Sequence, residues 1–127
     1  FIHKLKADPS RLEVLGNGLQ EKSYMEVLDC AHAMVHLTET TDDDVNCFNL
    51  GTDDTCSVRR IAEIVIEETG FENVSIEYTG GDRGWAGDVP KTMLDPSALF
   101  ATGFEPNFNS EDAIRHTATT LIQEIGL

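Results

Sequence analysis

The sequence predicts a small mixed α/β domain, and three observations support this fold class. The chain has 127 residues, the usual size of one domain and too few for two. Apolar residues recur at helical spacing in four separate segments, whereas residues 74–79 alternate as a half-buried strand does. No internal repeat or low-complexity linker divides the chain, so we predict a single domain over residues 1–127.

The first segment is expected to be helical. Phe1, Ile2 and Leu5 share one helical face, and Pro9 must end that helix nearby. The pattern predicts that the chain starts within a helix, and the chain has neither an initiator methionine nor a signal-peptide pattern. We therefore expect it to be a fragment of a longer chain, with nothing that directs it to secretion.

Two strands and a helix are expected next. LEVLG (12–16) and KSYMEVL (22–28) are typical of short strands, and Gly16-Asn17-Gly18 is a turn signal between them. Asp29 is then expected to cap a helix. The apolar positions of that helix are Cys30, Ala33, Met34 and Leu37.

The middle of the chain predicts a strand, a helix and a second strand. CFNLG (47–51) is a short apolar run typical of a strand. Ser57 is placed to cap a helix that Gly70 ends in the left-handed conformation. The residues buried by this helix are predicted to be Val58, Ile61, Ala62 and Val65. VSIEYT (74–79) is the alternating strand, so the glycine-rich stretch after it lies at a strand's C-terminal end.

Two further helices are predicted at the end of the chain. Asp95-Pro96 and Gly103 bracket a helix of one to two turns. Ser110 is expected to cap the last helix, and Gly126 to close it. The apolar face of the last helix carries Ile114, Ala118, Leu121 and Ile125.

The charge of the chain limits its partners. Nine basic and 23 acidic residues give a net charge of −14, which repels nucleic acid and anionic lipid. No apolar run approaches the roughly 20 residues of a membrane span, so we expect a soluble protein. The acidic residues are spread along the whole chain and only four residues are lysines, which favours a surface adapted to high salt and a halophilic source.

The cysteines and the polar clusters predict no metal site. Three cysteines without a C-x-x-C pair disfavour a disulfide framework or a zinc knuckle and indicate a reducing, cytoplasmic compartment. His32 and His36 are four residues apart and form either two metal ligands or a solvated helix face, and we favour the solvated face. Residues 42–44 are three aspartates that lack the glycine and distal glutamate of a calcium loop, which favours a charged surface loop.

The stretch GGDRGWAGDVPKTMLD (80–95) is the strongest candidate for a site. It sets Arg83 among four glycines, which let a ligand approach the backbone closely. Arg83 and Lys22 can neutralise a small diphosphate through charge-assisted hydrogen bonds. The alternative is a structural ion pair between Arg83 and Asp82 or Asp88. No P-loop, G-x-G-x-x-G or G-x-S-x-G motif occurs, so a self-sufficient cofactor site is not predicted.

Four motifs in order carry a family resemblance. They are LEVLGNGLQEKSYMEVLDCAHAM, FNLGTDDTCSVRRIAEIV, GGDRGWAGDVPKTMLD and ALFATGFEPNFNSEDAIRHT. Together they resemble the C-terminal part of the NAD-dependent epimerase/dehydratase family, the extended short-chain dehydrogenases that act on nucleotide sugars, and most closely its UDP-glucose 4-epimerase-like members. The resemblance covers nearly the whole chain. It implies a C-terminal nucleotide-sugar-binding domain whose N-terminal Rossmann half is missing.

The resemblance also implies substrate-binding residues. Backbone groups of Glu13 and Leu15 are expected to contact the uracil. Lys22 stands where the family usually has an arginine that touches the phosphates, so the charge is kept without the bidentate fork. In the family pattern R-x-G-D the aspartate, here Asp88, lies near the ribose. The arginine position of that pattern holds Trp85, which we expect to pack rather than to stack on the ligand.

Arg83, two residues before Trp85, is the proposed substitute for the missing arginine. The family's Tyr-x-x-x-Lys pair, which moves the proton, has no counterpart, because Leu28 follows Tyr24 and Asp82 follows Tyr78 at that spacing. The chain is therefore expected to bind a UDP-sugar without a catalytic residue, a metal or a cofactor of its own.

NAD and catalysis are expected to belong to the Rossmann half of the parent enzyme. That half is the expected partner, and apolar surface on Ile2, Leu5 and residues 47–51 is expected to be left exposed without it and to favour self-association. The alternatives are a non-catalytic module that binds a nucleotide or a partner, and a dehydratase, decarboxylase or reductase of the same family.

Overall fold

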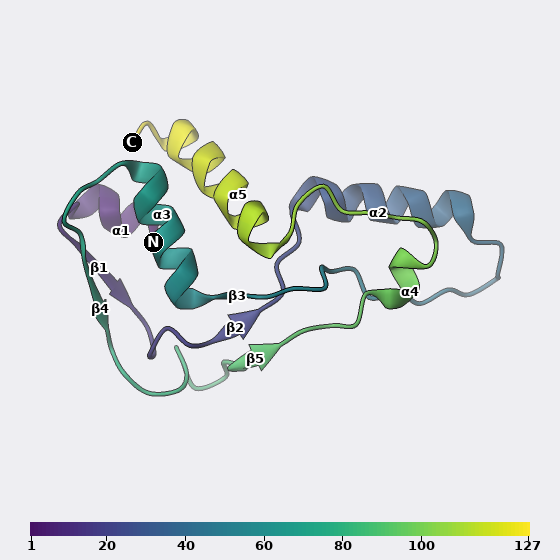
Figure 1. Cartoon of the computed structure of the whole chain (residues 1–127), viewed down its shortest axis with the longest axis horizontal. Helices are drawn as coiled ribbons and strands as arrows, with labels where there is room; N and C mark the ends of the chain where they lie inside the picture. Colours follow the sequence, from purple (N-terminus) through teal and green to yellow (C-terminus); the bar gives the residue numbers. More distant parts are fainter.

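The computed structural model describes residues 1–127 as one mixed α/β unit (Figure 1). Helices α1, α3 and α5 lie with strands β1 and β4 at one end, and α2 and α4 lie at the other. Strands β2, β3 and β5 cross the middle, and the two termini lie near each other. The elements are α1 (Ile2–Ala7), β1 (Arg11–Val14), β2 (Glu21–Lys22), α2 (Val27–Thr40), β3 (Cys56–Ser57), α3 (Val58–Thr69), β4 (Ser75–Tyr78), β5 (Lys91–Thr92), α4 (Ser97–Phe100) and α5 (Ser110–Ile125).

Strands β1 and β4 form a parallel pair in which Leu12 lies opposite Ile76. Leu12 and Val14 are fully buried, whereas Arg11 and Glu13 face outward, as the period of two requires. Parallel strands end at the same edge of a sheet. The turn after β1 and the glycine-rich stretch after β4 therefore meet, and Gly80 N donates to Gly16 O at 2.9 Å.

The second sheet is small and has the order β3-β2-β5. Strand β2 pairs antiparallel with β3 and parallel with β5, so that Lys22 lies opposite both Cys56 and Thr92. The predicted strand over 22–28 is therefore mostly wrong: only Lys22 of that segment is in a strand. The turn at Gly16 and Gly18 exists, with φ of 80° and 76°, but it leads from one sheet into the other and makes no hairpin.

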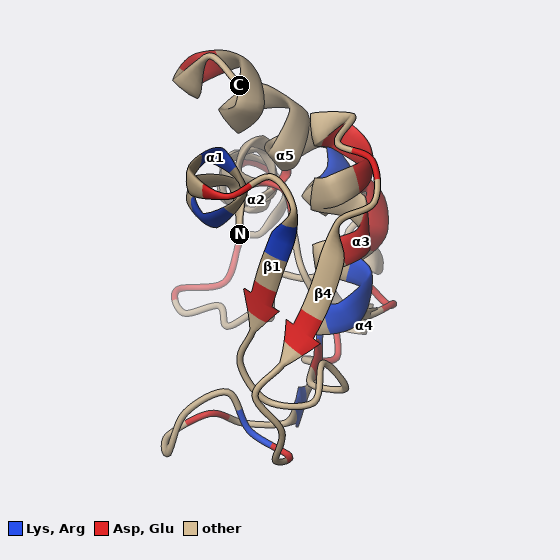
Figure 2. Ribbon diagram, turned by 90° about the vertical axis from the view of Figure 1, so that its left-hand side faces the viewer, with Lys and Arg blue, Asp and Glu red and all other residues tan.

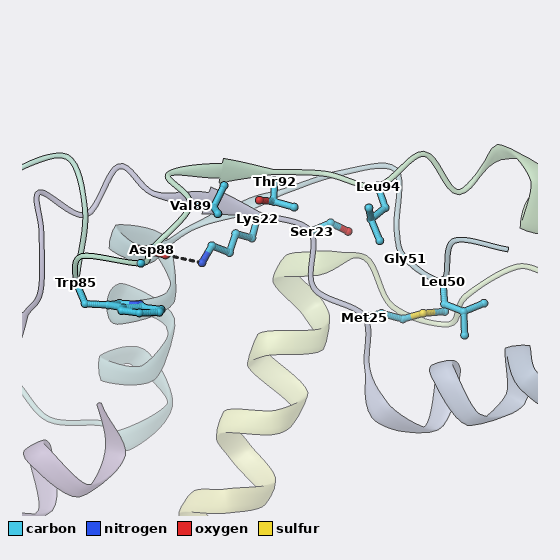
Figure 3. Close-up of a pocket in the computed structure, with 11 residues that line it drawn as sticks. Lys22, Ser23, Met25, Leu50, Gly51, Trp85, Asp88, Val89, Thr92 and Leu94 are labelled. Carbon is cyan, nitrogen blue, oxygen red and sulfur yellow. Dashed lines mark hydrogen bonds and ion pairs between the residues drawn. The ribbon is translucent and has the colours of Figure 1, made fainter. Parts of the chain in front are cut away.

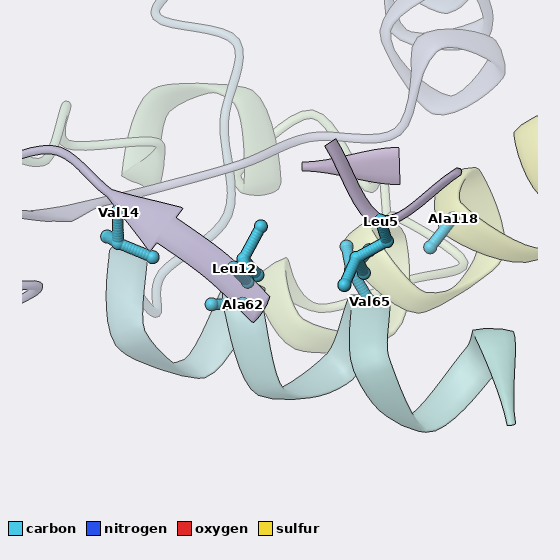
Figure 4. Packing of buried hydrophobic residues seen from close by; sticks show 6 residues of the cluster. All are labelled: Leu5, Leu12, Val14, Ala62, Val65 and Ala118. Atoms are coloured by element: carbon cyan, nitrogen blue, oxygen red, sulfur yellow. The ribbon is translucent and has the colours of Figure 1, made fainter. Parts of the chain in front are cut away.

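The larger hydrophobic cluster fills the space between β1, α3, α1 and α5 (Figure 4). Its buried members are Leu5, Leu12, Val14, Ala62, Val65 and Ala118. The expected exposure of Leu5 is wrong, because this side chain is fully buried within the chain itself. Truncating a fully buried leucine such as Leu12 to alanine costs about 2–5 kcal/mol, because transfer and cavity terms add.

Helix α3 has the predicted boundaries. The Ser57 hydroxyl accepts from Arg60 N at 3.1 Å, and Gly70 closes the helix with φ of 69°. Acidic residues follow the arginines at its start, and Figure 2 shows this acidic side of α3 together with the basic residues of α1. Two ion pairs bridge α3 to α5: Arg60 with Glu111 at 2.6 Å and Arg115 with Glu67 at 2.7 Å. These pairs offset part of the like-charge repulsion that a net charge of −14 creates.

Helix α2 buries little of its surface. A smaller hydrophobic cluster of Ala33, Leu99 and Phe104 holds it against α4. The remaining apolar residues of α2 are exposed, among them Val27, Leu28, Met34 and Val35 at 73, 59, 55 and 56%. This apolar face of α2 has no partner in the chain. No helix of the protein is both long and apolar enough to cross a bilayer.

Two predicted caps are displaced. Glu26, not Asp29, caps α2 by accepting from Leu28 N and Asp29 N. Asp29 is buried and instead accepts three hydrogen bonds from Asn107 and Phe108. In α5 the cap is Asn109, whose side chain accepts from Asp112 N at 2.8 Å.

Ser110 does not cap α5 as predicted but connects three segments of the chain. Its hydroxyl accepts from Tyr24 N at 3.0 Å and lies 2.8 Å from the Thr52 hydroxyl. It therefore joins the segments after β2 and before β3 to the start of α5. The strand expected over 47–51 is not formed, because no neighbouring strand pairs with this segment.

Candidate functional site

A pocket of about 340 Å³ lies beside β2, between the glycine-rich loop and the segment at residues 50–51 (Figure 3). The loop contributes one end of the pocket, and apolar side chains form the other end. Its lining residues are Lys22, Ser23, Met25, Leu50, Gly51, Trp85, Gly87, Asp88, Val89, Thr92 and Leu94. The pocket therefore gathers residues from three of the four motifs in the sequence.

An ion pair between Lys22 and Asp88 organises the loop end. Lys22 Nζ lies 2.8 Å from Asp88 Oδ1, and the other carboxylate oxygen accepts from Gly84 N at 3.1 Å. Asp88 N donates in turn to Trp85 O at 3.0 Å, which closes residues 84–88 into a turn. The hydrogen bond from Lys22 is the main reason that the pKa of Asp88 lies below the usual range, and the same bond raises the pKa of Lys22. Both groups are therefore charged at neutral pH.

The position of this pair follows from the small sheet. Lys22 is held by the β2–β5 pairing opposite Thr92, and Glu21 N donates to Pro90 O at 2.7 Å. The chain between Asp88 and β5 is thereby fixed against β2. The Asp88 side chain is 9% exposed, whereas the Lys22 side chain is 36% exposed, so a ligand in the pocket can reach the ammonium group.

Trp85 does not pack into the protein as expected, because 67% of it is exposed. Its ring lies against Gly87: a Cβ added at Gly87 would be 2.3 Å from indole Cζ3. Only glycine at this position leaves the ring where it is. The indole lies at the same end of the pocket as the Lys22–Asp88 pair (Figure 3).

Sequence reasoning did not find the opposite end of the pocket. Met25 and Leu50 pack against the smaller hydrophobic cluster, and with Leu94 they make that end apolar. Hydroxyl groups of Ser23 and Thr92 lie between the two ends. In the sequence Leu50 is only part of an apolar run, and no sequence pattern predicts that it lies in the same pocket as Lys22.

The structure brings together two of the five predicted substrate-binding residues, Lys22 and Asp88. Arg83 is exposed, does not line the pocket, and forms no ion pair with Asp82 or Asp88, so the structural alternative for it is wrong. Glu13 and Leu15 also lie outside the pocket lining. Their carbonyl oxygens accept from Lys4 Nζ at 3.0 Å and from Gln20 Nε2 at 3.3 Å.

The tyrosine and the histidines near or outside the pocket supply no charged group to it, and no metal-ligand cluster is present. Burial raises the pKa of the Tyr24 phenol, which keeps it protonated at neutral pH. His36 Nε2 lies 3.0 Å from the Thr102 hydroxyl, and His32 is exposed on the same helix. No group of three or more His, Cys, Asp or Glu side chains is close enough to hold a metal ion. The pocket can thus hold and orient a ligand, with one cation and one anion beside an exposed indole.

Comparison with known proteins gives similar sequences and similar structures. GDP-mannose 3,5-epimerase 1 of Oryza sativa subsp. indica is 26% identical over 125 residues, which covers 98% of this chain and 32% of that protein. A crystal structure of UDP-galactose 4-epimerase is 31% identical, with a TM-score of 0.82, and the match covers 98% of this chain and 39% of that one. No family model matches the sequence.

A more distant structure has the same fold and holds ligands. UDP-glucuronic acid 4-epimerase from Bacillus cereus, in complex with UDP-glucuronic acid and NAD, superposes with a TM-score of 0.75 at 17% identity. The match covers 98% of this chain and 38% of that one. The chain thus spans about a third to two fifths of the proteins that it matches.

Proposed function

The chain is distantly homologous over its whole length to NAD-dependent nucleotide-sugar epimerases, and from this premise we propose that it is the substrate-binding part of such an enzyme. The favoured reaction is that of a UDP-glucose 4-epimerase, which the 31% identity to UDP-galactose 4-epimerase supports. The observation that carries the proposal is the Lys22–Asp88 pair in the pocket, because it joins the two motifs that the resemblance assigns to the nucleotide.

In this proposal Lys22 binds the diphosphate. An ammonium group has three donors, and Asp88 occupies one of them, so two remain for phosphate oxygens. Asp88 then accepts a further hydrogen bond, from a ribose hydroxyl. Arg83 supplies the second positive charge: it is exposed and forms no ion pair, so its side chain is free to swing toward an anion over the pocket.

The base is proposed to lie along the end of β1, against the backbone of Glu13 and Leu15. Their carbonyl oxygens each accept one hydrogen bond, and a carbonyl oxygen has a second lone pair. The turn that follows has glycines at 16 and 18 and admits a flat ligand close to the backbone.

Catalysis is assigned to a second body, an N-terminal Rossmann half. NAD, when bound there, accepts a hydride from the sugar. The residues of this chain hold and orient the nucleotide sugar beside it. The exposed apolar face of α2, from Val27 to Val35, supports the proposal of a partner body, since large exposed apolar patches usually mark contact surfaces.

Calorimetric titration with UDP-glucose, UDP-galactose, GDP-mannose and dTDP-glucose tests the binding role. Lys22→Ala and Arg83→Ala are each expected to weaken the binding of UDP-sugars by about 1.5–3 kcal/mol, the value of a hydrogen bond to a charged group. The control is Lys91→Ala, an exposed lysine on β5 outside the pocket, which is expected to bind as the wild type does. Failure of all four nucleotide sugars to bind would refute the proposal.

A turnover assay separates the enzyme reading from a non-catalytic nucleotide-binding module. The chain is mixed with UDP-galactose and NAD, alone and with a separately expressed Rossmann half of a UDP-galactose 4-epimerase. Formation of UDP-glucose only in the second mixture supports the proposal, whereas turnover by the chain alone contradicts it. Binding without turnover in either mixture supports the module.

A further inference from the structure

We propose that Trp85 is the stacking surface of the pocket and that it sets the ligand preference by contact with an uncharged ring face of the ligand. The proposal rests on the proposed function, because it takes the ligand to be a nucleotide sugar. That ring face belongs either to the nucleobase or to the sugar. The position itself departs from the R-x-G-D pattern, in which an arginine stands where this chain has Trp85.

The first observation is exposure combined with position. Trp85 is 67% exposed and lines the pocket beside Lys22 and Asp88. Leaving a large aromatic ring in water is unfavourable, and exposed aromatics at the edge of a pocket are typical ligand contacts.

The second observation is that the loop is built to hold the ring. Asp88 N donates to Trp85 O, Gly84 N donates to Asp88 Oδ2, and Lys22 fixes the same carboxylate to β2. Gly87 lies under the indole so closely that any side chain there would displace it. Because the φ of Gly87 is not in the left-handed region, the requirement for glycine comes from the ring and not from the backbone.

The third observation is the charge of the lining. Lys22 is the only cation among the lining residues and Asp88 the only anion, and the two are paired at 2.8 Å. The lining therefore has no net charge, so only the two free donors of Lys22, and Arg83 from outside the lining, attract an anionic ligand electrostatically. Stacking on an indole adds affinity that does not depend on charge, as it does where proteins hold bases on aromatic side chains.

The experiment uses the fact that Trp85 is the only tryptophan of the chain. Its emission reports on the pocket alone, so saturation with UDP-galactose is expected to shift or quench it. Calorimetry is expected to give about a three- to tenfold weaker Kd for Trp85→Ala and less than a twofold change for Trp85→Phe. Leu19→Ala, which is 63% exposed but outside the pocket, is the matched control and is expected to bind normally.

Two further measurements test whether the affinity comes from stacking or from charge, and whether the base or the sugar contacts Trp85. At 1 M KCl, where the Debye length is about 3 Å, the loss caused by Lys22→Ala is expected to shrink while the loss caused by Trp85→Ala stays. A loss that appears with UDP as well as with UDP-galactose places the base on Trp85, whereas a loss confined to UDP-galactose places the sugar there. Gly87→Ala is expected to shift the emission of the unliganded protein, because the ring must move.

The outcomes separate the two proposals. If the wild type binds UDP-galactose but Trp85→Ala binds it equally well and the emission stays constant, stacking is refuted and the proposed function stands. If the wild type binds no nucleotide sugar, both are refuted. Circular dichroism of each variant checks its fold, which an exposed loop residue is not expected to disturb.

Discussion

Asp29 is expected to be the polar residue on which the stability of the chain depends most. It is 1% exposed, and its carboxylate accepts from Asn107 N at 2.9 Å, from Asn107 Nδ2 at 2.6 Å and from Phe108 N at 3.1 Å. These bonds tie α2 to the segment that leads into α5. Asp29→Ala would leave the three donors without their acceptor in a site that the side chain closes to water.

The magnitude follows from those three bonds. A hydrogen bond to a charged group contributes about 1.5–3 kcal/mol net, and bonds that share one carboxylate are not additive. We therefore expect Asp29→Ala to lower the free energy of unfolding by about 3–5 kcal/mol. Typical domains have about 5–15 kcal/mol in total, so the variant is expected to be partly unfolded at 37 °C.

Urea denaturation followed by circular dichroism measures this loss. Asn107→Ala removes one of the three bonds and is expected to cost about 1.5–3 kcal/mol. Asp44→Ala is the control, since Asp44 is an exposed aspartate without a hydrogen bond, and its midpoint is expected to match the wild type. An Asp29→Ala midpoint equal to that of Asp44→Ala would show that the reasoning is wrong.

Three further predictions concern charge and surface. The net charge of −14 predicts that Tm rises from low to molar KCl, as screening relieves repulsion, and a flat profile in calorimetry would contradict this. The hydrogen bond from Lys22 lowers the pKa of Asp88. The Lys22–Asp88 pair therefore contributes fully to stability at pH values above the usual aspartate pKa, and this contribution is lost as the pH falls through the lowered pKa. Trp85 emission is thus expected to be constant from pH 8 to about 5 and to change only below about 4, and a change near neutral pH would contradict the assignment. Leu28→Glu and Val35→Glu are expected to abolish any self-association seen in sedimentation, which unchanged association would disprove.

The elements that the sequence predicts best are those with local signals. Helix α3 begins after Ser57, ends at Gly70 and is followed by the alternating strand β4, all as expected. A cap, a left-handed glycine and an apolar period are decided within a few residues of the chain. These local features therefore form in the same way regardless of how the distant parts of the chain pack.

The wrong predictions share one physical cause. Residues 22–28 and 47–51 have strand-like composition, but a strand needs a partner, and the partner is set by the whole fold. Only Lys22 of the first segment pairs, and the second segment pairs with nothing. Asp29 and Ser110 stand near helix starts, which favours caps, but each is buried in contacts with distant segments.

The site was predictable in part. Charge reasoning and the family resemblance predicted Lys22, and the resemblance predicted Asp88, 66 positions away, but neither indicated that the two bind each other. Ser23, Leu50 and Leu94 became pocket residues only through the pairing of β2 with β5 and the packing around α2. Trp85 is exposed where packing is the expectation, because a sequence does not indicate how much of a ring remains in water.

The separation of the hydrophobic residues into two clusters has a consequence for cooperativity. Met25 and Leu50 belong to the smaller cluster and form one end of the pocket, while Lys22 and Trp85 form the other. A local opening of the smaller cluster removes half of the pocket and leaves the larger cluster folded. A ligand that touches both ends binds only the closed form and stabilises it by mass action. Ligand occupancy thereby couples the opening of the smaller cluster to that of the glycine-rich loop and β2, which form the other end of the pocket.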